Sequence, residues 1–213
     1  EKIHLSPKSL HATRDGGFLI TYGKQGSFSK YCKKFPYSQD ATNTTPTQTV
    51  TIDDVTDADS VVGNFSANND DKFTPGVLEL PNSNIMFYWV ISSLPSLQPK
   101  TGSTVNNAGC YWKIYDSDLN ELTLGQNSNT VGYFQNSNGS IYESIFQDTN
   151  NCHLYYMNET YILLAGNKTF GPTASEGSIN AFKNSVYVFD KNYTFLRNII
   201  MGGHTSAPSD SHY

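Results

Sequence analysis

The sequence predicts an all-β fold made of antiparallel four-stranded units. A strand–turn–strand pattern at residues 111–124 returns at 186–200, and in a looser form at 31–50. In each copy, β-branched and aromatic residues flank a polar turn, which is the pattern of a β-hairpin. Aromatic residues make up 13% of the chain and charged residues 15%, below the roughly 25% of ordinary soluble proteins. No segment shows the periodicity of an amphipathic helix.

We expect one all-β region with three units, at residues 9–55, 74–127 and 141–201, followed by a tail or linker at 202–213. The first strand of each unit is predicted at 9–13, 76–80 and 152–157. Each is followed by a turn, because Gly and Asn tolerate positive φ and Pro presets φ for a turn. The second strands are predicted at 18–22, 85–91 and 161–165. Their near-continuous apolar character predicts burial on both faces.

The third and fourth strands of each unit are the hairpin pattern itself. In the second unit, Leu122 and Leu124 resume the alternation after the turn. The loops that follow the second strands differ in length, and such loops on a repeated frame are common places for binding surfaces. Polar segments at 53–72 and 126–140 are expected to bridge successive units.

Four-stranded antiparallel units in series are typical of a β-propeller. Asp-Gly-Gly-Phe at 15–18 opens an apolar strand, and Tyr/Phe-Asp before a turn occurs at 115–116 and 189–190, whereas 35–36 is Phe-Pro. In these elements about half of the chain resembles the propeller-like repeat arrays of large secreted and surface proteins. The resemblance implies blade-like units. Three units are fewer than a closed propeller needs, so further blades, a second chain or a β-sandwich remain alternatives.

The three cysteines, Cys32, Cys110 and Cys152, lack the CxxC spacing of a zinc site. One pair can form a disulfide in an oxidising compartment, and buried thiols are the alternative. The longest apolar run, at 85–91, is far shorter than the roughly 20 residues of a membrane span. We therefore expect no membrane-spanning segment. Without an initiator Met or a signal peptide, we expect a mature segment or part of a longer protein.

A net charge of −5 argues against a nucleic-acid partner, because binding to phosphates requires clustered basic residues. The basic cluster Lys30, Lys33 and Lys34 is expected to be a solvated strand face.

Six Asn-x-Ser/Thr acceptors for N-glycosylation fall in predicted turns and bridges: Asn43, Asn64, Asn138, Asn158, Asn167 and Asn192. A glycan can project into solvent from such positions, which favours an extracellular or cell-surface location.

Four carboxylates crowd into seven residues at Asp53, Asp54, Asp57 and Asp59. Oxygen ligands of this kind suit calcium, and a solvated acidic loop is the alternative. Residues 116–127 begin like an EF-hand loop, but Glu121 replaces the glycine of the sharp turn, so a hairpin turn is expected.

We expect no enzyme, and no catalytic residue is assigned. Carboxylates that could serve a glycosidase are Asp15, Asp116, Glu143 and Asp190, but no motif pairs them. The prediction is therefore an extracellular structural or adhesive glycoprotein module that contacts other protein chains, copies of itself included. Its contacts would use the loops at 92–109 and 166–183. The alternative is a carbohydrate-binding or carbohydrate-cleaving domain, which would contact glycans through loop aromatic residues.

Overall fold

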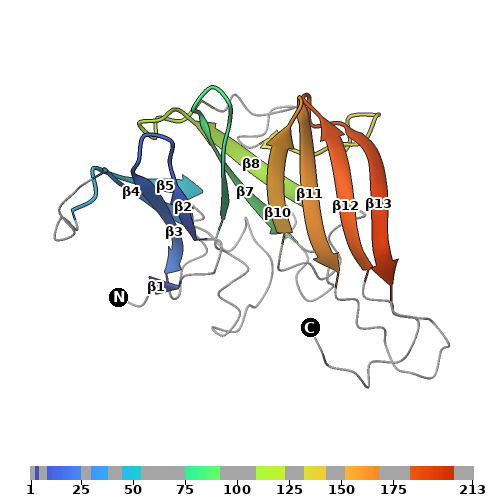
Figure 1. Cartoon of the computed structure of the whole chain (residues 1–213), viewed down its shortest axis with the longest axis horizontal. Coiled ribbons are helices and arrows are strands. Elements are labelled where there is room, and N and C mark those ends of the chain that lie inside the picture. Colours follow the sequence, from blue (N-terminus) through green and yellow to red (C-terminus); the bar gives the residue numbers. More distant parts are fainter. Residues whose placement is uncertain are drawn as a thin grey trace, which may run out of the picture.

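The computed structural model of the chain consists of three antiparallel β-sheets in a row (Figure 1). It describes residues 3–4, 9–24, 30–37, 45–53, 75–91, 109–122, 132–142, 152–167 and 183–203. These residues form thirteen strands. None of the described residues belongs to a helix that is long and apolar enough to cross a membrane. The predicted all-β class is confirmed.

The first sheet has the order β1-β3-β4-β5, with β2 also paired to β3. Its strands are β1 Ile3–His4, β2 Leu10–Ala12, β3 Phe18–Lys24, β4 Lys30–Phe35 and β5 Gln48–Asp53. β1 pairs with the end of β3 and β2 with its beginning. The two short strands therefore form one edge, and the sheet is four strands wide.

The second and third sheets are simple meanders in which neighbouring strands follow each other along the chain. The second sheet contains β6 Gly76–Glu79, β7 Ile85–Ile91, β8 Gly109–Tyr115 and β9 Gly132–Tyr133. The third contains β10 Cys152–Met157, β11 Thr160–Asn167, β12 Lys183–Asp190 and β13 Phe195–Gly203. The expected repetition of four-stranded antiparallel sheets is thus confirmed, and the sheets do not close into a ring.

The second sheet lies between the other two and is buried on both faces. Along β7, Ile85, Phe87 and Trp89 belong to a buried cluster shared with the first sheet. Met86 and Tyr88, which alternate with them, belong to a cluster shared with the third sheet. This alternation explains why the strand is continuously apolar, and it confirms the expected burial on both faces for 85–89.

The same expectation is wrong for β11. Tyr161 and Leu163 are buried against the second sheet, but Leu164 points to the opposite face and is 37% exposed. Among the described residues no sheet covers that face. A continuous apolar run identifies two apolar faces, and whether both are covered depends on the neighbours.

The fourth strand of the second sheet also differs from the expectation. After β8, Glu121 forms a single bridge with Tyr115 and Leu122 is exposed. The strand that completes the sheet is β9, inside the predicted polar bridge at 126–140.

A row of side chains across the second sheet explains why β9 takes this place. The strand register aligns Gly76, Tyr88, Trp112 and Gly132 in one row. A Cβ atom at Gly76 would lie 2.2 Å from the Tyr88 ring, and one at Gly132 would lie 2.2 Å from the Trp112 ring. Both edge strands therefore offer bare backbone on which a large ring lies flat. Tyr133 and Phe134, next to Gly132, are buried and anchor the strand in the two core clusters.

Candidate functional site

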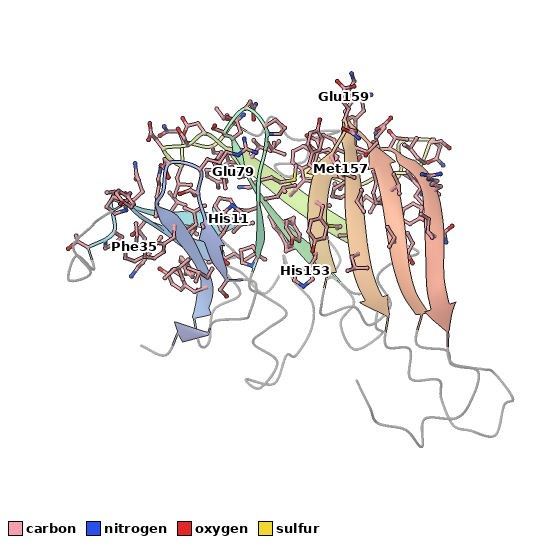
Figure 2. The ribbon with its side chains drawn as sticks, viewed as in Figure 1. His11, Phe35, Glu79, His153, Met157 and Glu159 are labelled. Carbon is pink, nitrogen blue, oxygen red and sulfur yellow. The ribbon has the colours of Figure 1, made fainter. Side chains whose placement is uncertain are left out.

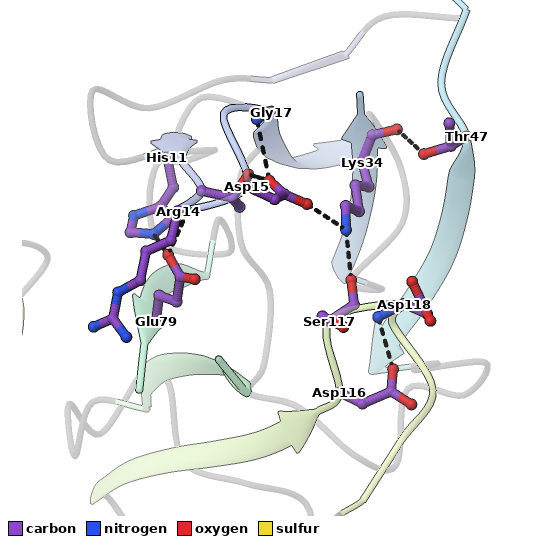
Figure 3. Close-up of polar contacts among 11 residues, drawn as sticks. His11, Arg14, Asp15, Gly17, Lys34, Thr47, Glu79, Asp116, Ser117 and Asp118 are labelled. Atoms are coloured by element: carbon purple, nitrogen blue, oxygen red, sulfur yellow. Dashed lines mark hydrogen bonds and ion pairs between the residues drawn. The ribbon is translucent and has the colours of Figure 1, made fainter. Parts of the chain in front are cut away.

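A small cleft with several polar side chains in its lining lies where the turns of the first and second sheets meet (Figure 3). Its volume is about 60 Å³, which is room for a few water molecules. The residues that line it are Thr13, Arg14, Asp15, Leu19, Lys34, Glu79, Ser83, Ile85 and Ser117. Three turns contribute to it, so its geometry follows from how these turns are held.

The turn between β2 and β3 requires the Asp-Gly-Gly sequence. An Asp15 Oδ1 atom accepts hydrogen bonds from the Gly17 N–H, at 3.1 Å, and from the Thr13 hydroxyl. Gly16 has φ of +86°, in the left-handed region that favours glycine. At Gly17, a Cβ atom would lie 2.4 Å from the carbonyl oxygen of Phe35. Each residue of this motif therefore has a structural reason.

Other turns at the same end of the sheets are closed by the same kind of side-chain hydrogen bond. In each, an Asp or Asn oxygen accepts the N–H of the residue two positions later, an Asx-turn. The acceptors are Asn82, Asp116, Asn138 and Asp190. Of the carboxylates considered for a glycosidase, Asp15, Asp116 and Asp190 thus hold turns, and Glu143 lies outside the described residues.

Lys34 joins the first two sheets through the cleft. Its Nζ atom lies 3.1 Å from Asp15 Oδ2 and donates a hydrogen bond of 2.7 Å to the Ser117 carbonyl oxygen. Hydrogen bonds from Thr13 and Gly17, helped by the Lys34 ammonium, lower the pKa of Asp15 to about 2. Asp15 is therefore ionised at neutral pH and has no proton to donate as a general acid.

The opposite wall of the cleft is formed around Glu79. Its Oε2 atom accepts the Arg14 backbone N–H at 3.0 Å and lies 3.9 Å from His11 Nε2 (Figure 3). The Arg14 guanidinium donates to the carbonyl oxygens of Leu80 and Pro81. Burial lowers the pKa of His11, and the Glu79 charge opposes this only in part, so the imidazole is neutral at pH 7. These polar groups connect one sheet to the next.

The basic cluster is not a solvated strand face, so that expectation is wrong. Lys30 is only 3% exposed, and its Nζ atom lies 5.1 Å from the centroid of the Trp89 ring. Lys33 lies over the Tyr22 ring at 5.6 Å. Long aliphatic stems can be buried along apolar surface while the ammonium contacts an aromatic face. Charge alone could not reveal this, because the aromatic partners come from other strands.

The cysteines are distributed over two cores. Cys32 is a free thiol in the cluster between the first and second sheets, and Cys110 is buried in the cluster between the second and third. No disulfide joins these two residues. Burial raises the pKa of the Cys32 thiol to about 12, so it is protonated at neutral pH. Cys152 begins β10, and its side chain lies outside the described part of the structure.

Three of the predicted glycosylation sites lie on exposed turns at one end of the sheets: Asn138, Asn158 and Asn192. Asn167 ends β11, and its side chain is not described. Asn43 and Asn64 lie outside the described residues.

Of the predicted calcium ligands, only the backbone of Asp53 is described, at the end of β5, and Asp54, Asp57 and Asp59 lie outside. The described ranges contain no group of three or more His, Cys, Asp or Glu residues placed to hold a metal ion.

Comparison with protein families, with curated proteins and with solved structures gave no match for this chain. The functional interpretation therefore depends on the geometry described above. The sequence singled out Asp15, and Lys34 as part of a basic cluster, but not Arg14 or Glu79. The contacts of Lys34 with Ser117 and of Arg14 with Glu79 cross between sheets, so no local pattern could have identified them.

Proposed function

We propose that the chain is an extracellular structural module that contacts other protein chains, including copies of itself. The observation that supports this most is the outer face of the third sheet, which we call the tail face. Strand pairing puts the following residues on it: His153, Tyr155, Ile162, Leu164, Val186, Val188, Arg197 and Ile199. Met157 shares the outward-pointing side of β10 and lies at its turn end (Figure 2).

The tail face is mostly apolar and is accessible, with His153 and Arg197 as its polar members. Tyr155 is 54% exposed, Met157 58%, Leu164 37% and Ile199 42%. Scattered apolar side chains on a surface are ordinary, but a contiguous group on one sheet face indicates a site of contact with another protein. The adjacent aliphatic side chains of Ile162, Leu164, Val186 and Ile199 suit the face of another sheet, and Tyr155 is the one exposed phenol ring of the tail face.

The proposed architecture is a series of blade-like units, as in a propeller-like array, with a layered sandwich as the alternative. Glycans on Asn138, Asn158 and Asn192 would project from the turns. The tail face, on the side of the strands, would stay accessible. This separation of glycans from the apolar face supports an extracellular role in which protein contacts are made laterally.

Sedimentation velocity over a wide range of protein concentrations tests the proposal. We expect the sedimentation coefficient to rise with concentration in the absence of any sugar. Thermal unfolding with soluble saccharides is the companion measurement, because a ligand that binds the folded state raises its melting temperature. A chain that stays monomeric and melts at a higher temperature with a saccharide would instead indicate a carbohydrate-binding module.

A further inference from the structure

We infer that copies of this chain associate head to tail: the tail face of one copy packs on the outer face of the first sheet of the next. This inference rests on the proposed function and specifies its partner and geometry. The outer face of the first sheet, called the head face, carries Leu10, Phe18, Ile20, Tyr22, Tyr31, Lys33 and Phe35. In Figure 2, Phe35 on the first sheet and Met157 on the third lie in different parts of the row of sheets.

The strand registers show which residues occupy equivalent positions in the three sheets. Cross-strand pairs at the start of the second strand are Phe18 with Phe35, Ile85 with Tyr115, and Tyr161 with Phe189. Ile85 and Tyr115 lie in the cluster shared with the first sheet. Tyr161 and Phe189 lie in the cluster shared with the second sheet. In both cases the pair contacts the preceding sheet.

Phe18 and Phe35 thus occupy, in the first sheet, the position that contacts a preceding sheet. Their rings stack on each other with centroids 4.7 Å apart, and both side chains are half-buried. Four residues further along β3, Tyr22 and Tyr31 stack in the same way at 5.3 Å, and Tyr22 is only 4% exposed. The head face is therefore an aromatic surface equivalent to the one that the second sheet presents to the first.

The tail face holds the opposite set of positions. In the second sheet, Met86 pairs with Ile114 and Tyr88 with Trp112, and these residues pack toward the third sheet. The equivalent pairs in the third sheet are Ile162 with Val188 and Leu164 with Val186. On the two inner strands of the third sheet, the positions that contact a following sheet are therefore aliphatic, and they form the centre of the tail face.

The two interfaces within the chain give the rule for a third. In each interface, one sheet packs the face that points toward the next sheet along the chain. The next sheet packs the face that points back toward it. Between the first two sheets, aliphatic Leu19 and Ile52 meet the aromatic side chains of Phe87, Trp89 and Tyr111. An aliphatic tail face against an aromatic head face repeats this combination, and a second copy of the chain supplies it. Such a contact is heterologous, so it continues into a ring or an open array.

Three single substitutions of an apolar residue by glutamate test this geometry. Leu164→Glu puts a charge on the tail face, and Ile20→Glu puts one on the head face, opposite Lys33 in the register. Leu122→Glu is the matched control, because Leu122 is 45% exposed and lies on neither face. Circular dichroism and thermal unfolding establish that each variant is folded. If either variant fails to fold, Tyr155→Glu on the tail face or Leu10→Glu on the head face replaces it, since both positions are more exposed.

The variants are compared by sedimentation velocity, alone and mixed. We expect the control to assemble like the unaltered chain, and Leu164→Glu and Ile20→Glu each to remain monomeric where the unaltered chain assembles. An equimolar mixture of these two variants should form a dimer and no larger species, because each chain keeps one intact face.

The other outcomes are distinguishable. If Ile20→Glu alone still dimerises, the tail face binds another tail face, and head-to-tail association is wrong while the proposed protein contact stands. If both variants assemble like the control, the contact uses other surfaces, and the head-to-tail inference is again overturned. If the unaltered chain is monomeric at every concentration, the inference and self-association under the proposed function both fail.

Discussion

Substitution of Gly132 by alanine tests the row of side chains that places β9 in the second sheet. The added Cβ atom would lie 2.2 Å from the Trp112 ring, where ordinary contacts begin at 3.4 Å, so ring or strand must move by about 1.2 Å. Trp112 is buried, and its ring lies 4.1 Å, centroid to centroid, from that of Tyr193. Overpacking of this kind costs about 1–3 kcal/mol. Loss of the ring contact with Tyr193 adds about 0.5–1.5 kcal/mol.

We therefore expect Gly132→Ala to lower the free energy of unfolding by about 2–4 kcal/mol. The assay is urea unfolding followed by tryptophan fluorescence, in which the midpoint falls while the slope is unchanged. Gly23→Ala is the control, because Gly23 is also a strand residue but no atom of the described residues lies within 4 Å of its added Cβ. In the control, stability should change by less than about 1 kcal/mol, since only the freedom of the unfolded chain is reduced.

A double variant makes the test specific to the ring. Trp112→Phe makes the ring smaller. In that background, Gly132→Ala should lower the free energy of unfolding by less than it does in the unaltered chain. The effects of the two substitutions on stability should therefore not be additive. If Gly132→Ala is as well tolerated as Gly23→Ala, or if its cost is the same with either ring, the contact of Trp112 with Gly132 does not hold β9.

Three further predictions concern single side chains. Tyr88→Phe removes the acceptor of the buried Leu154 N–H, a bond of 3.1 Å that joins the second and third sheets, and should cost about 1–3 kcal/mol by urea unfolding. Asp15→Ala should destabilise the chain by up to about 1 kcal/mol at pH 7. Because the pKa of Asp15 falls from 3.8 to about 2 on folding, this difference should shrink below pH 4 and reach its low-pH limit only below pH 2, where the protonated carboxyl keeps the turn acceptor alone. Asp15→Asn also retains the turn acceptor and should cost less than Asp15→Ala. Equal losses for the two variants would contradict the turn assignment. Cys32 is fully buried and has a pKa of about 12, so its thiol should resist iodoacetamide in the folded chain and react on unfolding. Peptide mapping by mass spectrometry measures this labelling. Fast labelling of the folded chain would contradict the burial of Cys32.

The sequence alone determined the local features of this protein. Hairpin patterns at 111–124 and 186–200 predicted where strands and turns alternate, because turn chemistry and alternation depend on neighbours a few residues apart. The continuous apolar run at 85–91 predicted a strand with two apolar faces. The Asp-Gly-Gly turn at 15–17 was predicted for the same local reason. The structure adds contacts from β4, which are the carbonyl of Phe35 that Gly17 approaches and the ammonium of Lys34 beside Asp15.

Only the tertiary structure decided which surfaces meet. Lys30 is buried because Trp89, from another sheet, lies over its position. Gly132 joins a strand inside a polar segment because the Trp112 ring needs bare backbone beneath it. Two apolar faces were foreseen for both β7 and β11, but β7 has a sheet on either side and Leu164 of β11 remains exposed. These outcomes depend on packing between residues far apart in the chain, and local periodicity carries no information about the partner.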